Sequence, residues 1–151
     1  MRSLRIGVIV ASVAFAQTLA TSATANQTFH TLTAPLSPID GQPLQSGWVH
    51  DIHMNGNVNG GREVYHVAGA IPNAAFQVEI FFYSGGTCSS PAVLIDTAVL
   101  TTNGAGNANG NWTFPANHTP TVTTDSAIWE LVGPNGPAYT TPCEVVLIGG
   151  K

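Results

Sequence analysis

The sequence predicts an all-β protein, and three observations lead to that prediction. Apolar and polar side chains alternate with a period of two along several short runs, as they do along half-buried β-strands. Turn residues separate these runs at short intervals, with 16 glycines and 10 prolines among the 151 residues. No segment has a sustained helical period. Seven or eight candidate strands separated by such turns are typical of an antiparallel β-sandwich or a Greek-key barrel.

The chain begins with a segment that has the organisation of an export signal. Arg2 and Arg5 precede an apolar run at 6–16, and Ala23-Thr24-Ala25 provides a small-residue cleavage site. We interpret residues 1–25 as a signal peptide, because the apolar run is too short to span a bilayer. No second run of that kind follows, so we expect no membrane span and a secreted, extracellular or periplasmic location.

Removal of this segment changes the charge balance of the protein. The basic residues that remain are Arg62 and Lys151, two against eight carboxylates, which gives a net charge of −6. Nucleic acids and anionic membrane surfaces are bound by basic patches, so neither is expected as a partner. The remaining 126 residues, 151 less 25, suit one domain.

The first strands are expected around a proline-rich stretch. Residues 26–45 are predicted to be a Pro- and Thr-rich lead-in to a β-sandwich domain at 46–151. Prolines lack a backbone donor, so the lead-in can supply at most short edge strands, one of them at 28–33. The next strand is predicted at 47–54, and the Asn/Gly-rich run at 55–61 that follows it predicts a tight turn.

The strongest strand signal lies at 76–83, after a strand at 62–68 and a proline corner. Every second residue of this run is apolar, which gives one wholly apolar face: Phe76, Val78, Ile80 and Phe82. A slip of one residue would bury Gln77 and Glu79 instead, so burial of the apolar face fixes the register. Four such side chains stabilise the fold by about 1.5–3 kcal/mol each when fully buried, which predicts a central strand.

The second half of the chain supplies the remaining strands and a disulfide. Strands are expected at four places, separated by a hairpin-like Asn/Gly turn at 103–111 and a Gly/Pro turn at 133–137: 92–101, 112–114, 127–132 and 143–148. Cys88 and Cys143 both follow the export signal, and the oxidising environment outside the cell favours a disulfide between them. Closing a loop of this length stabilises the fold by about 4 kcal/mol.

One short segment carries a family resemblance. Residues 70–78, AIPNAAFQV, resemble the corner of fibronectin-type and other immunoglobulin-like domains, in which a proline precedes a strand with an aromatic ring and then a valine. Phe76 stands where the corner of that family has a tyrosine. The resemblance implies an immunoglobulin-like antiparallel β-sandwich of the kind found in small proteins exported by bacteria, and it implies no particular function.

A cluster of polar residues at 48–54 makes a metal site the first alternative function. Asp51 and His53 share one face of a strand, whereas His50 points the other way. With His66 from a neighbouring strand they would form a two-histidine, one-carboxylate site, or with Met54 a copper-type site. Copper or zinc binding through Asp51, His53 and His66 is therefore a candidate, and exposed histidines on a sheet are the simpler interpretation.

A small secreted hydrolase is the second alternative. Glu63 and Glu79 are candidates for a glycosidase-like acid and nucleophile, which would have to face each other across a cleft. Ser84, His66 and Asp51 include the residue types of a catalytic triad, but no G-x-S-x-G motif supports one. The sequence has no phosphate-binding loop, and we expect no cofactor.

A binding function is favoured over both alternatives. Aromatic residues that can stack on sugar rings or fill a protein interface are spread along the chain: Trp48, Tyr65, Tyr83 and Trp112. Each tryptophan is also a candidate core residue. We therefore expect an exported, non-catalytic binding or cell-envelope-associated protein with a carbohydrate or protein ligand.

Overall fold

The computed structural model describes residues 29–54, 61–89, 92–114 and 126–146, and this part of the chain is all-β. The predicted signal peptide lies outside these residues, and none of the described residues forms a helix that could cross a membrane. The strands, in chain order, are β1 (Phe29–Pro35), β2 (Ser37–Pro38), β3 (Ser46–Met54), β4 (Gly61–Ala68), β5 (Ala75–Tyr83), β6 (Val93–Thr101), β7 (Ala108–Phe114), β8 (Ser126–Gly133), β9 (Gly136–Thr140) and β10 (Glu144–Val145).

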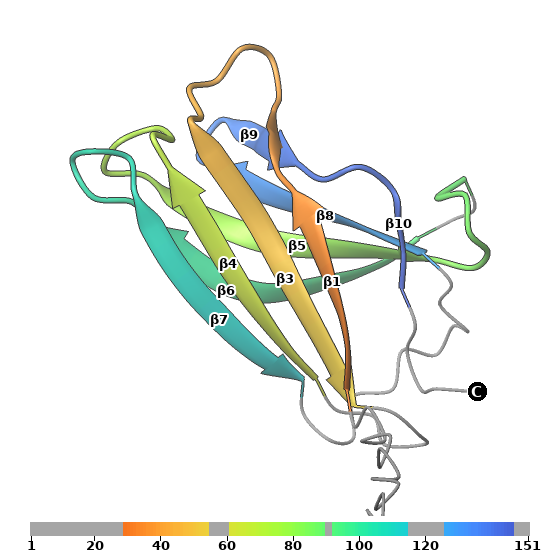
Figure 1. Cartoon of the computed structure of the whole chain (residues 1–151). Helices are drawn as coiled ribbons and strands as arrows, with labels where there is room; N and C mark the ends of the chain where they lie inside the picture. Colours follow the sequence, from red (N-terminus) through yellow and green to blue (C-terminus); the bar gives the residue numbers. More distant parts are fainter. Residues whose placement is uncertain (1–28, 55–60, 90–91, 115–125, 147–151) are drawn as a thin grey trace, which may run out of the picture.

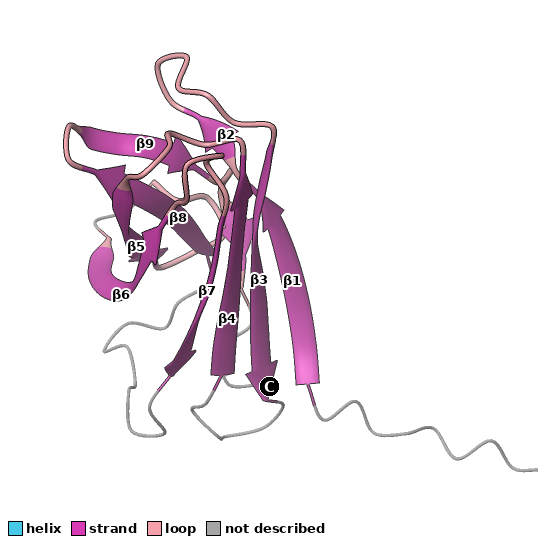
Figure 2. Ribbon diagram, turned by 90° about the vertical axis from the view of Figure 1, so that its left-hand side faces the viewer, coloured by secondary structure: helices cyan, strands magenta, loops and turns pink. Residues whose placement is uncertain are grey.

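The strands form two antiparallel sheets that face each other in a sandwich-like arrangement (Figure 1). The four-stranded sheet has the order β1-β3-β4-β7. The six-stranded sheet has the order β2-β9-β8-β5-β6, with β10 also paired to β8. Figure 2 shows both sheets from a second direction, with the four-stranded sheet to the right of the other. In each sheet, the inner face packs against the other sheet and the outer face points away from it.

The proline-rich lead-in is part of the sandwich. β1 pairs with β3 along its whole length and forms one edge of the four-stranded sheet, and β2 pairs with β9 at an edge of the six-stranded sheet. The prediction of edge strands in this stretch is confirmed. The division into a lead-in at 26–45 and a domain at 46–151 does not correspond to a structural boundary, because both sheets include strands from the lead-in.

The predicted central strand is β5, which has β6 on one side and β8 on the other. All four members of its predicted apolar face are buried on the inner side, whereas Gln77 and Glu79 lie on the outer side: Phe76, Val78, Ile80 and Phe82. The core around them is completed by Val49, Tyr65, Val67, Leu100, Phe114, Trp129, Leu131 and Tyr139. Burial of apolar area on β5 therefore sets the register, as the alternation predicts.

The predicted disulfide is present. Cys88 and Cys143 are bonded, with their Cα atoms 5.9 Å apart. The bond ties the segment after β5 to the start of β10. Ser126 lies beside this junction, where its hydroxyl accepts a hydrogen bond from the backbone N–H of Cys88 at 3.3 Å.

The Asn/Gly stretch at 103–111 is a crossover and not the hairpin turn that its composition predicts, because β6 and β7 belong to different sheets. The side-chain oxygen of Asn103 accepts hydrogen bonds from the backbone N–H groups of Ala105 and Asn107, at 2.9 and 3.0 Å. Gly106 has a φ of 76°, and a Cβ there would lie 2.1 Å from the carbonyl oxygen of Ala70. The crossover is therefore short, and β7 begins at Ala108 instead of 112.

The proline corner before β5 is held by a residue from β9. Phe76 is buried against Tyr139, with the ring centroids 5.4 Å apart. The Tyr139 hydroxyl accepts a hydrogen bond from the N–H of Ile71 and donates one to the carbonyl of Pro43, each at 2.9 Å. A tyrosine hydroxyl thus reaches this corner, although Phe76 cannot provide one.

Candidate functional site

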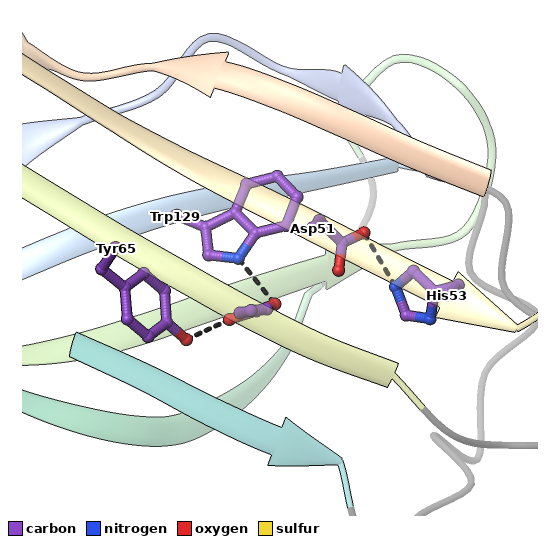
Figure 3. Close-up of polar contacts among 5 residues, drawn as sticks. Asp51, His53, Tyr65 and Trp129 are labelled. Carbon is purple, nitrogen blue, oxygen red and sulfur yellow. Dashed lines mark hydrogen bonds and ion pairs between the residues drawn. The ribbon is translucent and has the colours of Figure 1, made fainter. Parts of the chain in front are cut away.

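A cluster of titratable side chains is enclosed between the two sheets. Asp51 on β3 is the direct cross-strand neighbour of Glu63 on β4, and both project from the inner face. Glu63 is completely buried, and Asp51 and His53 are 3% and 5% exposed. Carboxylates are rarely buried to this degree unless other groups satisfy them. Figure 3 shows the cluster.

Glu63 is hydrogen-bonded at both carboxyl oxygens. The indole Nε1 of Trp129, on β8, donates to Oε1 at 2.9 Å, and the Tyr65 hydroxyl donates to Oε2. The Tyr65 hydroxyl also lies 2.8 Å from the Thr97 hydroxyl, which donates to the carbonyl of Val78 at 3.3 Å. Hydroxyl groups both donate and accept, so this chain stays hydrogen-bonded whether or not Glu63 carries a proton. The network joins both sheets.

The buried position changes the protonation of these groups. Burial, and then the charge of Asp51, raise the pKa of Glu63 to about 8, although the hydrogen bonds from Tyr65 and Trp129 act in the opposite direction. Burial and the neighbouring Glu63 also raise the pKa of Tyr65. Glu63 is therefore mostly a neutral carboxylic acid at pH 7.

Asp51 and His53 form the second half of the cluster. His53 Nε2 lies 2.8 Å from Asp51 Oδ2, and the His53 ring packs on Phe114 with centroids 5.1 Å apart. A Cβ on Gly61 would lie 2.9 Å from His53 Nδ1, so glycine is needed beside this ring. The other oxygen of Asp51, Oδ1, is buried without a hydrogen-bond partner. Both halves of the cluster are thus enclosed between the two sheets.

The three residues predicted to bind a metal are divided between two faces of one sheet. Asp51 and His53 are on the inner face, whereas His66 is the cross-strand neighbour of Trp48 on the outer face. Antiparallel neighbours point to the same side of a sheet, so His66 cannot join the other two. Among the described residues, no group of three or more His, Cys, Asp or Glu side chains could hold a metal ion. The side chain of Met54 lies outside the described part.

The outer face of the four-stranded sheet carries the second notable group. Trp48 is half-buried and stacks on His66 with ring centroids 5.4 Å apart and an interplanar angle of 23°. His66 Nδ1 and Asn109 Oδ1 share a hydrogen bond of 2.8 Å, and His50 Nδ1 and the Thr33 hydroxyl share one of 2.7 Å. Side chains from all four strands thus hold these rings in place.

The four predicted stacking residues do not form one platform. Tyr65 is buried in the core as part of the Glu63 network. Trp112 packs against the core and lies edge-on to Phe114, at 4.4 Å between ring centroids. Tyr83 is on the outer side of β5, in the other sheet. Of the four, Trp48 alone lies on the outer face of the four-stranded sheet.

No protein family, curated protein or solved structure matches this chain. The function must therefore be argued from the two groups themselves.

The candidate hydrolase residues are also separated. Glu63 is inside the sandwich, whereas Glu79 is on the outer face of the six-stranded sheet. Of the candidate triad, Asp51 and His66 lie on opposite faces of the four-stranded sheet, and Ser84 follows the end of β5 in the other sheet. The structure therefore brings together neither Glu63 with Glu79 nor Ser84 with His66 and Asp51, as the two candidate mechanisms would require.

The buried network was not predicted from the sequence. The sequence makes Glu63 a candidate catalytic acid and Tyr65 a candidate ligand-stacking ring, whereas in the structure the two side chains are hydrogen-bonded to each other. The sequence does contain one indication that they are buried. Glu63, Tyr65 and Val67 share one face of the strand, and the side chains of Tyr65 and Val67 are large and apolar enough to prefer the core. The partner of Glu63 on β8, Trp129, is 66 residues away in the sequence.

Proposed function

We propose that this protein is exported and acts as a non-catalytic binding or cell-envelope-associated β-sandwich, through the outer face of its four-stranded sheet. The observation that carries the proposal is the stack of Trp48 on His66, a half-buried aromatic pair held by polar side chains on an outer sheet face. Burial of the other titratable cluster between the sheets supports a role without catalysis.

The binding surface consists of three cross-strand rows, and we call it the tryptophan face. Each row has one residue from each of β1, β3, β4 and β7: Thr31, Ile52, Arg62 and Thr113; Thr33, His50, Val64 and Asn111; Pro35, Trp48, His66 and Asn109. Amides and hydroxyls surround the aromatic pair, and no carboxylate is present in any row. The hydrogen bonds that fix both histidines reduce the entropy lost on binding.

A carbohydrate is the ligand class that this surface fits best. A sugar ring has apolar C–H faces that stack on an aromatic ring, and its hydroxyls pair with side-chain amides and hydroxyls such as those of Asn109, Asn111 and Thr33. A protein ligand is the other class that a half-buried aromatic residue with polar neighbours fits.

The same proposal includes export and an immunoglobulin-like fold. The Cys88–Cys143 disulfide supports an oxidising location. In immunoglobulin-like domains, strands B and E pair in one sheet while C, F and G are neighbours in the other. The pairing of β4 with β7, and the order β9-β8-β5 with β6 beside β5, support the same arrangement, with β4 as strand B, β5 as C and β8 as F.

The experiment is a screen on immobilised glycans, with the affinities of any hit measured by isothermal titration calorimetry, comparing the wild type with Trp48→Ala. We expect binding of at least one carbohydrate class and a loss of about thirtyfold or more in affinity for the variant, as for a binding hot spot. Tyr83→Ala is the matched control, because it truncates an aromatic residue on the other sheet and should bind normally. Binding that survives Trp48→Ala, or no binding to any glycan, would refute the carbohydrate proposal.

A further inference from the structure

The outer face of the six-stranded sheet carries three carboxylates in one row. Glu79 on β5 is the direct cross-strand neighbour of Asp96 on β6 and of Glu130 on β8. Like charges in directly opposite positions destabilise a sheet. No described lysine or arginine lies on this face, because the single one in the described part, Arg62, belongs to the tryptophan face. Within the described part of the chain, no lysine or arginine on this face therefore neutralises the row.

Apolar side chains flank the carboxylates on both sides. Leu94 and Val99, both on the edge strand β6, are 51% and 63% exposed. They extend rows of half-buried residues on β5 and β8, and the row with Leu94 includes Phe81 and Ile128. We call this surface, the carboxylate row and its apolar flanks, the acidic face. Exposed apolar residues bordered by polar side chains are typical of an interaction surface.

The carboxylate of Glu130 is disfavoured in its ionised form by its position in the row. Burial, and then the charge of Glu79, raise the pKa of Glu130. A cation placed over the row would reverse this effect by favouring the ionised carboxylates.

The two outer faces of the molecule have opposite charge. Among the described residues, the tryptophan face holds the guanidinium of Arg62 and no carboxylate, whereas the acidic face holds three carboxylates and no lysine or arginine. They lie on opposite sides of the sandwich (Figure 2). Arg62 is exposed, and a guanidinium pairs with carboxylates through two parallel hydrogen bonds. The tryptophan face of one copy of this chain is therefore complementary in charge to the acidic face of another copy.

We propose that the acidic face docks onto the tryptophan face of a second copy, with Arg62 over the carboxylate row. A contact between two different faces is heterologous, and because these faces lie on opposite sides the contact does not close. The product is an open-ended stack of sandwiches. The proposal rests on the proposed function in one respect, that the tryptophan face is a binding surface, and it makes a carbohydrate and a second copy competitors for that face.

The test is sedimentation velocity over a range of protein concentrations, at low and high salt, with two charge-reversal variants. The wild type should form species beyond dimers at low salt, and high salt should dissociate them because charge attraction is screened. Arg62→Glu alone and Glu79→Lys alone should each lower the association constant about tenfold or more. An equimolar mixture of the two should recover long species, because each copy then offers the face that the other needs.

Asp40→Lys is the control, because it makes the same charge change as Glu79→Lys in an exposed turn outside both faces. It should associate like the wild type, and near-UV circular dichroism should show all variants folded. A wild type that stays monomeric, or a mixture that associates no better than its components, overturns the proposal. If Trp48→Ala loses glycan binding and the wild type does not self-associate, this inference is rejected and the proposed function is supported. If the wild type self-associates but shows no glycan binding that depends on Trp48, self-association is supported and the carbohydrate ligand is rejected.

Discussion

Strands β3 and β4 build two polar groups on opposite faces of the same sheet, from residues that alternate along the chain. On the inner face Asp51 and Glu63 are sealed between the sheets, while on the outer face Trp48 and His66 stack beside solvent. On the inner face, the hydrogen-bond partners of a polar side chain determine its protonation and its contribution to stability. On the outer face, water forms hydrogen bonds with polar atoms that have no protein partner, so the same residue types remain available for a ligand. The comparison separates residues that hold the fold from residues that are free to bind.

The largest expected effect concerns the pH dependence of the inner face. The pKa of Glu63 is raised from its ordinary value near 4.5 to about 8, so between these pH values the folded state binds more protons than the unfolded state. Stability from this group is therefore fully present below about pH 4.5, falls by up to about 1.4 kcal/mol per pH unit as pH rises, and levels off above pH 8. Urea unfolding at a series of pH values measures the slope.

Glu63→Gln isolates this contribution, because the amide keeps the shape of the side chain and cannot ionise. Its unfolding free energy should decrease less than that of the wild type between pH 5 and 8, a range inside the window of the cited pKa shift. If wild type and variant have parallel pH profiles, Glu63 does not titrate in this range and the account of the buried cluster is wrong.

A smaller effect is expected for Tyr65→Phe, which removes only the hydroxyl. Glu63 Oε2 and the Thr97 hydroxyl both lose a partner inside the sandwich, and an unsatisfied buried polar group costs about 1–3 kcal/mol. Thermal or urea unfolding at a fixed pH measures the loss. Tyr83→Phe makes the same chemical change on an outer face and should cost less than about 0.5 kcal/mol.

These comparisons also indicate what the sequence can predict. The inner face of β5 is recognisable because all four of its side chains are apolar, and the disulfide is predicted from two cysteines that follow a predicted export signal. The inner face of β4 cannot be recognised in this way, because both faces of the strand carry a titratable residue, Glu63 on the inner face and His66 on the outer face. The decisive partner of Glu63 is Trp129, which a neighbouring sheet supplies. A hydrogen bond to a buried acid from a residue far away in the sequence leaves no local sequence pattern.

The candidate sites were harder to predict for a related reason. Alternation along β3 correctly separates His50 from Asp51, but the position of His66 relative to them depends on the register between β3 and β4. The Asn/Gly composition of residues 55–61 is compatible with more than one loop length, so the sequence does not fix that register in advance. A shift of one residue in the register would place Tyr65 or Val67 opposite Trp48 instead of His66. The sequence alone therefore predicts neither a metal site nor a stacking pair at this position.

A smaller loss of stability than that of Tyr65→Phe is expected for His66→Ala on the tryptophan face. The variant loses the stack with Trp48 and the hydrogen bond to Asn109, both at the surface, and should destabilise the fold by less than about 1 kcal/mol. Its effect on binding should be larger, because Trp48 then loses the ring that fixes its orientation. Unfolding and glycan titration on one preparation separate the two effects. A large loss of stability with unchanged binding would mean that this face holds the fold, and the distinction between inner and outer groups would fail.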